Sequence, residues 1–479
     1  MQTELSQPGP LLDEQGRLVQ VGWSRQPLLD ANLEAARFYR LRALQRFRIK
    51  RWDYYAVFTP RRFFSATIAD LGYAGNIFVY TLDFATGELH EEGLVIPLGK
   101  GISLPRGSLS GETTFADQRA RLTFQALPGE RRLSVDWPAF HAGRGIHAEL
   151  TLALPPEHQS MNIVIPIGKQ RFYYNTKINC LPTCGTLRYG DIHEQLLPES
   201  SLGSLDWGRG VWEYSSYWNW ASASGFLPDG RTLGLNLGCG FGELSAATEN
   251  AIILQGRMHK LDQVTFDYIS GKYMQPWQFR DNEHRLALTF TPFKERLAAT
   301  RLGIIDSEVH QMFGRYAGEL TTDDGERLVI SDLIGLLKST GRVGNIIASC
   351  APDGQQVILR TGRVRHFDKR QHMQRKFLTV MFGLLLATVV LVGSALAAVG
   401  DGSVQPMRIA GPAGYADQPQ IRFITPTPTP PNLDDYPSPV RSEAGRDFGL
   451  IIGAAFLVLI VIGGVIFSLR WRSQSKARD

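Results

Sequence analysis

Two carboxylates, an arginine and four tryptophans lie within residues 205–220, in the sequence LDWGRGVWEYSSYWNW. A carboxyl group buried beside aromatic rings can act as a general acid, because burial raises its pKa. Asp206 or Glu213 could then donate the proton that hydration of an isolated double bond requires. An ion pair between Asp206 and Arg209 that only fixes a bend at the neighbouring glycines is the alternative interpretation.

The tryptophan-rich segment predicts a strand from Val211 to Trp220, because its aromatic residues recur with period two. An aromatic face with a few polar groups is typical of a pocket for an apolar ligand, and it is equally typical of a large β core. Asn219 and Asn236 could hold a polar group of a ligand or satisfy buried backbone. The residues expected to contact a ligand are Trp207, Arg209, Trp212, Tyr214, Trp218, Asn219 and Trp220.

The third candidate for acid–base chemistry, after Asp206 and Glu213, is His259. Asp262 follows it by three residues and could orient its ring, although a structural role for a lone histidine at a strand end is the alternative. Cys180 and Cys184 have no second cysteine pair or histidine at zinc-ligand spacing, so we expect free thiols and no metal site. The glycine-rich segment 234–242 lacks the spacing of a dinucleotide site, and no cofactor is predicted.

The composition indicates a globular protein with room for two or three domains. Hydrophobic residues make up 43% of the 479 residues and charged residues 20%, which excludes a disordered chain. The formal net charge is only +5, and no stripe of basic residues alternates with aromatic ones. Nucleic acid is therefore not an expected partner.

Secondary-structure patterns favour an all-β fold. From Trp52 onward, short runs with period two alternate with turn signals such as Pro228-Asp229-Gly230, which is typical of a sandwich or barrel. Residues 28–50 are the exception, since Leu33, Phe38 and other apolar residues recur there at helical spacing among arginines. This basic amphipathic helix could lie on an acidic membrane surface or pack on a sheet with a solvated face.

Two long apolar runs near the end of the chain predict a membrane hairpin. Residues 377–399 and 448–469 carry no charge, and each is long enough to span about 30 Å of hydrocarbon. The Pro- and Thr-rich stretch 400–447 between them predicts an extended linker. Lysines and arginines gather in residues 363–376 and 470–479, so we expect these flanks in the cytoplasm and the linker outside.

The amino-terminal residues 1–17 are polar and show no secretory signal, so the β domain is expected on the cytoplasmic face of the cell membrane. Residues 373–376 followed by an apolar stretch and Ser394-Ala395-Leu396-Ala397 nevertheless have the form of a signal peptide. A natural fusion and a merged gene model both remain open for the tail.

The body of the chain resembles a family of unknown function, DUF2804, over roughly residues 5–335, and the tail lies outside the resemblance. The segments that carry it are Val21–Leu28, Arg51–Tyr55, Ala69–Gly75, Phe78–Asp83, Lys177–Pro182, Leu205–Gly225, Glu249–Ala251 and His259–Leu261. The family is similar to lipocalin-like proteins with two consecutive barrels, among them carotenoid hydratases and lipid-handling proteins. The resemblance implies a fold and supplies no catalytic residues.

The strand pattern predicts an all-β protein, and the resemblance implies two consecutive lipocalin-like barrels. The expected segments are an amino-terminal part at 1–50, barrel-like halves at 51–195 and 196–370, and the membrane hairpin with its tail. The predicted function is binding of a membrane lipid or another apolar small molecule. A hydratase or isomerase of an isoprenoid or lipid is the second hypothesis, and a structural or interaction protein without a ligand is the third.

Overall fold

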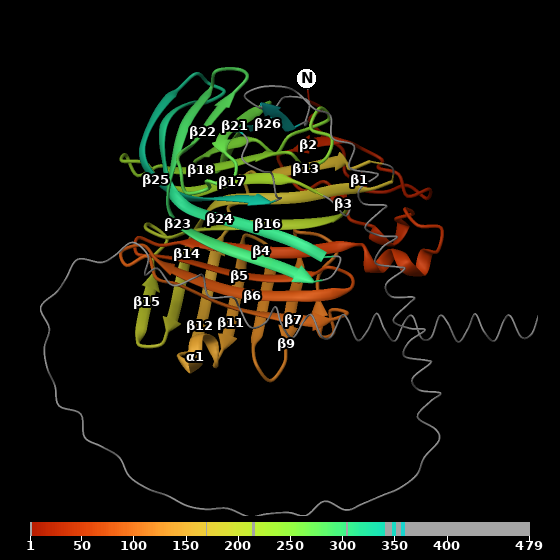
Figure 1. Cartoon of the computed structure of the whole chain (residues 1–479), viewed down its shortest axis with the longest axis horizontal. Coiled ribbons are helices and arrows are strands. Elements are labelled where there is room, and N and C mark those ends of the chain that lie inside the picture. Colours follow the sequence, from red (N-terminus) through yellow and green to blue (C-terminus); the bar gives the residue numbers. More distant parts are fainter. Residues whose placement is uncertain are drawn as a thin grey trace, which may run out of the picture. The chain divides into compact units, whose positions relative to one another are not determined.

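The computed structural model describes residues 2–168, 170–212, 216–302, 305–340, 347–350 and 356–359. These residues form two large antiparallel sheets, so the predicted all-β class is confirmed (Figure 1). Helical structure in the described part is limited to α1 (Phe140–Gly143) and two short 3-10 helices, η1 (Leu33–Ala35) and η2 (Arg42–Phe47). Strands β1 (Gly9–Pro10) and β3 (Leu29–Asp30) make a small parallel pair.

The first sheet has 14 strands and begins near the amino terminus. Its main path runs β7-β6-β5-β4-β16-β14-β12-β11-β10-β9-β8, and it extends beyond residue 195 because β16 is one of its central strands. The strands are β2 (Gly22–Ser24), β4 (Lys50–Phe58), β5 (Arg62–Asp70), β6 (Ala74–Asp83), β7 (Leu89–Pro97), β8 (Ile102–Ser103), β9 (Gly111–Ala116), β10 (Arg121–Leu127), β11 (Glu130–Trp137), β12 (Ile146–Ala153), β13 (Met161–Pro166), β14 (Phe172–Tyr189), β15 (Ile192–Leu196) and β16 (Leu202–Val211).

The second sheet has 11 strands in the order β20-β19-β18-β17-β25-β24-β23-β22-β21-β26-β27. All of its pairings are antiparallel, and most join strands that follow one another in the sequence. The strands are β17 (Trp218–Phe226), β18 (Thr232–Cys239), β19 (Ala251–Leu254), β20 (Arg257–Lys260), β21 (Val264–Ile269), β22 (Trp277–Asp281), β23 (Leu286–Leu302), β24 (Ile305–Thr321), β25 (Arg327–Thr340), β26 (Ile347–Cys350) and β27 (Gln356–Leu359).

Each sheet curls around a core of its own. Alternation along the strands builds these cores. Strand β11, for example, buries every second residue from Arg131 to Trp137, so one face of the strand is buried and the other is at least partly exposed to solvent. Phe64, Phe124 and Trp137 lie in the core of the first sheet, and Phe266, Trp277 and Phe290 lie in the core of the second. The architecture is therefore two half-barrels.

The two half-barrels are joined by further buried residues between the sheets. The register of β14 against β16 shifts between Ile178 and Leu181, and this bulge carries Asn179 toward the second sheet. Asn179 Nδ2 donates to Ser222 Oγ at 3.0 Å and to the Ala223 carbonyl at 3.1 Å. Two apolar clusters, one around Ile163 and Tyr173 and one around Phe63 and Phe313, also lie outside both cores.

The predicted helix over residues 28–50 is wrong. This segment holds β3, the 3-10 helices η1 and η2, and the start of β4. The buried side chain of Gln45 explains the irregular path: its Nε2 donates to the Ala36 carbonyl, and its Oε1 accepts the Tyr39 N–H at 3.3 Å. A side chain that bonds backbone groups in this way replaces the hydrogen bonds of a continuous helix.

The single strand predicted from Val211 to Trp220 is also wrong. Strand β16 ends at Val211 and β17 begins at Trp218, and the two strands belong to different sheets. Residues 213–215 between them lie outside the described residues. The aromatic residues of this segment are therefore divided between the two half-barrels.

Predictions for the end of the chain are not tested by the structure. Within the described ranges, which stop at residue 359, no helix combines the length and apolar character needed to cross a bilayer. Both predicted spans, 377–399 and 448–469, and the linker 400–447 lie outside those ranges and stay predictions. Cys180 and Cys184 are free thiols, as expected.

Candidate functional site

A group of charged side chains is buried where the two sheets face each other. Lys177 Nζ on β14 lies 3.0 Å from Asp206 Oδ1 on β16 and 3.4 Å from Glu249 Oε2, which comes from the loop before β19. The Lys177 side chain is only 4% exposed. One ammonium group therefore bridges carboxylates that belong to different half-barrels.

Aromatic rings and a second lysine complete the group. The ring of Trp220 on β17 lies under two ammonium groups, with Lys177 Nζ 4.3 Å and Lys338 Nζ 4.8 Å from its centroid. Lys338 Nζ also lies 3.8 Å from the centroid of Tyr54 on β4. Tyr54, Lys177, Asp206, Trp220, Glu249 and Lys338 together are called the inter-sheet cluster below.

Strand register explains why residues so far apart in sequence meet. On the first sheet Asp206 is directly opposite Tyr54 on one side and Lys177 on the other, so the three side chains share a face. On the second sheet Trp220 is directly opposite Lys338. The cluster therefore consists of two cross-strand rows, one from each sheet, with Glu249 beside them.

Two glycines make room for the cluster. A Cβ atom at Gly238, opposite Trp220 on β18, would lie 2.1 Å from Glu249 Oε1. A Cβ atom at Gly208 would lie 2.0 Å from the ring of Trp52. Gly208 therefore provides space within a regular ladder, and the bend that its sequence suggested is not formed.

The surroundings shift the pKa values of the two carboxyl groups in opposite directions. Burial raises the pKa of Glu249, and the charge of Asp206 raises it further in spite of Lys177. Burial alone would also raise the pKa of Asp206, but Lys177, Asn175 and Lys338 outweigh it and lower that pKa below its usual value. Paired carboxyl groups with opposite shifts are typical of acid–base sites.

The amino group of Lys338 is also perturbed. Burial lowers the pKa of Lys338 to about 7, although the charge of Asp206 favours the protonated form. A lysine in this range exchanges protons near neutral pH and can act as a general base. The cluster therefore combines a carboxylate of lowered pKa at Asp206, a carboxyl group of raised pKa at Glu249 and an amine of lowered pKa at Lys338.

Polar atoms beside the cluster lack a hydrogen-bond partner, and its two acidic side chains keep a small exposed surface. Within the described part, Asn175 Oδ1 beside Asp206 and Gln311 Nε2 opposite Lys338 are buried without a hydrogen-bond partner, whereas Glu249 Oε2 contacts Lys177 Nζ. The side chains of Asp206 and Glu249 keep 13% and 14% of their surface exposed, so both border on space of at least the size of a water molecule. Buried polar atoms without a partner point to a missing water or ligand group.

Aromatic rings form a wall beside Asp206, called the aromatic wall below. Trp52 Nε1 donates to Asp206 Oδ1 at 3.2 Å, and its ring stacks on Tyr173. The partly exposed Trp212 packs edge-on against Trp52 and against Phe241, with centroid distances of 5.7 and 5.4 Å. Apolar walls with a few polar groups at one end are typical of small-molecule sites.

Comparison with known families identifies the chain. A model of the family described as Domain of unknown function (DUF2804) matches residues 2–340. The chain belongs to this family. The match contains both half-barrels up to β25 and every residue of the inter-sheet cluster.

Three solved structures are similar to this DUF2804 protein at low sequence identity. CghA with Sch210972 is 11% identical, with a TM-score of 0.42 over 61% of this chain and 87% of that chain. A protein assigned as AttH from Nitrosomonas europaea is 15% identical, with a TM-score of 0.42 over 62% and 94%. Kievitone hydratase from Nectria haematococca is 10% identical, with a TM-score of 0.35 over 60% and 88%. No curated protein matches the chain.

The proposed pair of Asp206 and Arg209 does not form in this DUF2804 protein. Three positions apart on a strand, the two side chains point to opposite faces of the first sheet. Arg209 is fully buried in the core of the first half-barrel, where it contacts Asp53 Oδ1 at 3.0 Å and the Pro105 carbonyl at 3.0 Å. Only Asp206 faces the inter-sheet cluster.

The other predicted ligand contacts are divided among three places. Trp212, Trp218 and Trp220 lie at or beside the inter-sheet cluster. Trp207 packs on Tyr174 inside the first core, and Asn219 bonds Tyr217 Oη beside the second core. Asn236, the other asparagine considered, accepts the Trp220 Nε1–H at 2.7 Å. Glu213 and Tyr214 lie outside the described residues.

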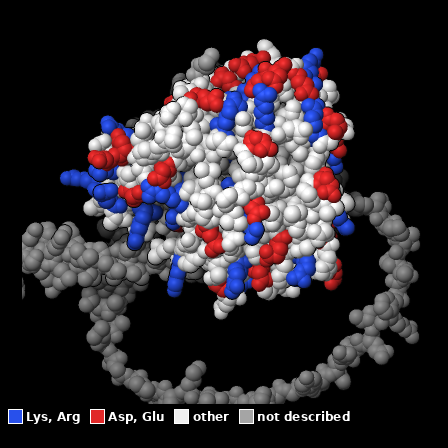
Figure 2. All heavy atoms as spheres, turned by 180° about the vertical axis from the view of Figure 1, so that it is seen from behind, with Lys and Arg blue, Asp and Glu red and all other residues white. Residues whose placement is uncertain are grey.

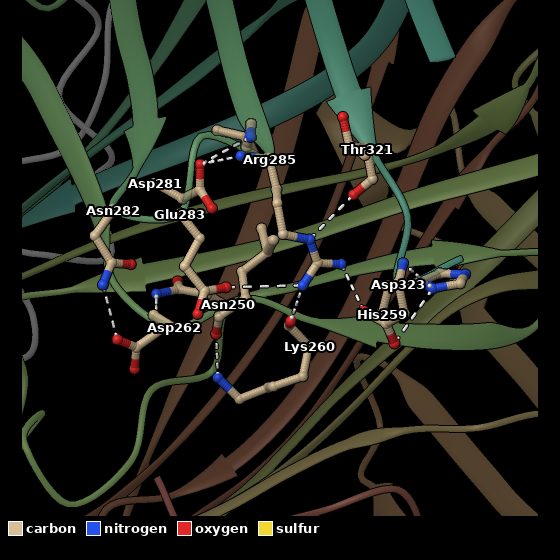
Figure 3. Close-up of polar contacts among 12 residues, drawn as sticks. Asn250, His259, Lys260, Asp262, Asp281, Asn282, Glu283, Arg285, Thr321 and Asp323 are labelled. Atoms are coloured by element: carbon tan, nitrogen blue, oxygen red, sulfur yellow. Dashed lines mark hydrogen bonds and ion pairs between the residues drawn. The ribbon is translucent and has the colours of Figure 1, made fainter. Parts of the chain in front are cut away.

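His259 belongs to a separate polar network at the edge of the second sheet (Figure 3). Its Nδ1 accepts the Asp323 N–H at 3.1 Å, and burial lowers its pKa in spite of the Asp323 carboxylate. Asp262, the partner predicted from sequence, instead accepts a hydrogen bond from Asn282 Nδ2 at 2.9 Å. The predicted pairing of His259 with Asp262 is therefore wrong.

Sequence reasoning missed the two lysines of the cluster and left Glu249 unassigned. Lys177 and Glu249 lie in segments that carry the family resemblance, and this position could have marked them as candidate site residues. Lys338 follows the apolar residues Leu336 and Leu337 on β25, and a lysine in such a run is rarely buried without a polar reason. Neither signal says which other residues would be near.

Proposed function

We propose that the protein binds an apolar small molecule between its two half-barrels and holds a polar group of that molecule on the inter-sheet cluster. The observation that carries this proposal is the position of Asp206 and Glu249, which keep a small exposed surface next to the aromatic wall that includes Trp52 and Trp212. Buried donors and acceptors then fix one end of the ligand, and the rings cover the rest.

The cost of the cluster supports a role in recognition. Removing several charges from water is expensive, and apolar residues of similar volume would often give a fold of equal or greater stability. Lys177 and Lys338 are buried beside a single indole ring. A polar ligand group that accepts hydrogen bonds would gain from both ammonium groups. A lipid or isoprenoid with a hydroxyl, carbonyl or carboxyl group has this chemistry.

Ligand content of the purified full chain tests the proposal. Small molecules released by denaturation are identified by mass spectrometry for the unaltered protein and for Trp220→Leu. We expect the variant to lose the ligand, because Trp220 supports both lysines. Trp207→Leu is the matched control, since this buried indole faces the first core and its loss should leave the ligand in place. No ligand in the unaltered chain, or equal content in all three proteins, would favour a structural role.

A second candidate function is hydration or isomerisation of a double bond in the bound molecule. The opposite pKa shifts of Glu249 and Asp206 favour it. Glu249 would transfer its proton to one carbon of the double bond. A water molecule would add through its oxygen to the other carbon and give its proton to Asp206 or to the Lys338 amine. Transfer of that proton back to Glu249 restores the site, so the sum is the addition of one water molecule and no cofactor is needed.

Isotope labelling distinguishes catalysis from binding. The recovered ligand is incubated with the full chain in water labelled with heavy oxygen, and the product of a hydratase gains the mass of one labelled water. Glu249→Gln should keep the ligand and abolish the mass gain, because the amide has no acidic proton. A ligand that is bound and unchanged by the unaltered protein would exclude hydration and leave the binding function intact.

A further inference from the structure

Arginine and leucine side chains are exposed together on one protruding segment, residues 37–46, called the basic loop below. Leu41 is 67% and Leu44 47% exposed, among the larger exposures of apolar side chains in the described part. The exposed basic residues of the loop are Arg37, Arg40, Arg42 and Arg46.

The arginines of the basic loop form no ion pair with a carboxylate among the described residues. Residues 35–52 contain no aspartate or glutamate. Arg42 donates to the Glu34 carbonyl at 3.3 Å, and Arg46 lies over the ring of Phe47. Figure 2 shows Lys and Arg side chains, with some Asp and Glu among them, at its left edge, which corresponds to the right side of Figure 1 where this segment projects.

The loop is held in place from beneath. The Gln45 side chain is buried and bonds the backbone at Ala36 and Tyr39. Behind the loop, Arg48 donates to Tyr39 Oη at 2.7 Å and to the Trp212 carbonyl at 2.9 Å. The exposed leucines are therefore presented on an anchored loop next to the aromatic wall.

We propose that the basic loop docks on an anionic lipid surface, with Leu41 and Leu44 inserted at the level of the headgroups. Arginines attract acidic headgroups, while exposed apolar side chains gain by leaving water at the boundary with the acyl chains. Binding to a nucleic acid would use the same charges but would leave both leucines in water. This inference goes beyond the proposed ligand site and does not depend on it.

A fluorescent label on the basic loop tests docking in the full chain. Its spectrum depends on the surroundings of the loop, so attachment of another part of the chain to the vesicle does not by itself change it. An environment-sensitive nitrobenzoxadiazole label is placed on the exposed Ala43→Cys in a Cys184→Ser background, which removes the exposed free thiol. Vesicles contain phosphatidylcholine alone or with phosphatidylglycerol. We expect a blue shift only with phosphatidylglycerol. The control label at Val329→Cys, where the native side chain is 72% exposed, should not shift.

Substitutions of the arginines and of the leucines separate the electrostatic from the apolar contribution to docking. Each basic residue near an anionic surface strengthens binding about fivefold, so Arg40→Glu with Arg42→Glu should lower the docked population by at least about 25-fold. Lys100→Glu with Arg188→Glu, at exposed positions outside the loop, makes the same change in net charge and should have little effect. Leu41→Ser with Leu44→Ser should abolish the blue shift.

Three results would overturn the proposal. The first is an unchanged label spectrum with phosphatidylglycerol vesicles, and the second is an equal loss in both charge variants. The third is an equal blue shift when a DNA duplex replaces the vesicles, which would make the loop a general polyanion site. None of these results depends on a ligand in the inter-sheet cluster, so the two proposals can fail separately.

Discussion

Lys177 Nζ lies 3.4 Å from Glu249 Oε2, and this contact crosses from the first half-barrel to the loop before β19 of the second. The same ammonium group contacts Asp206 within its own sheet. Lys177 is therefore the point at which an ionised carboxylate, a carboxyl group of raised pKa and both half-barrels meet. Its removal should affect stability and the site together.

Lys177→Met should lower the free energy of unfolding by about 3–5 kcal/mol at pH 7, because it leaves buried carboxylates without their counter-charge. Urea denaturation followed by tryptophan fluorescence measures the change. Lys100→Met at an exposed position is the control and should stay within about 0.5 kcal/mol of the unaltered protein. Adding Glu249→Gln to Lys177→Met should recover part of the loss, and a lower stability of the double variant would contradict the assignment.

Arg209→Met should also cost about 3–5 kcal/mol of stability, since the guanidinium is fully buried and Asp53 would lose its partner. The ligand content of the folded protein should not change, because Arg209 faces the first core and not the inter-sheet cluster. Denaturation and mass spectrometry on the same preparation check both statements. Loss of ligand from a folded Arg209→Met protein would show that Arg209 contributes to ligand binding.

Gly238→Ala should damage the site more than the fold. The added methyl group would overlap the Glu249 carboxylate, which has exposed surface and can move away from β18. We expect a stability loss of about 1–3 kcal/mol, typical of overpacking, together with loss of the bound ligand or of turnover. Gly107→Ala is the matched control, because a Cβ there meets nothing within 4 Å. Full function in Gly238→Ala would show that the position of Glu249 is unimportant.

The stability of the protein should rise with pH above neutrality through Lys338. Its pKa is about 7 in the folded state against 10.5 in the unfolded chain, so between these values the unfolded state binds more protons. The slope from this residue is at most about 1.4 kcal/mol per pH unit. Burial also lowers the pKa of Lys260 to about 7 and that of Lys50 to about 8, so three described lysines make such a contribution in the unaltered protein.

Lys338→Met removes one of these contributions. Denaturation midpoints measured from pH 6 to pH 10 should rise less steeply in the variant, and the variant should gain most relative to the unaltered chain at the acidic end. Parallel pH profiles for the two proteins would mean that Lys338 stays protonated in the fold.

Local sequence patterns were sufficient to predict the fold class and to predict which residues share a face of a single strand. Period-two alternation predicted strands correctly because side chains on a strand alternate whatever the strand pairs with. The same alternation separates Asp206 from Trp207 and Arg209, which the sequence-based hypothesis had grouped together. The helix predicted at 28–50 failed because the Gln45 side chain takes backbone contacts that a helix would have used.

The composition of the inter-sheet cluster was beyond the reach of the sequence. Asp206 and Trp220 could be singled out by their neighbours in the chain, whereas Lys177 and Lys338 became visible only through strand register. The sequence by itself determined an all-β chain of the DUF2804 family with strongly alternating strands. Only the tertiary structure decided which faces meet, because pairing between distant strands and the bulge at Asn179 bring the two sheets together.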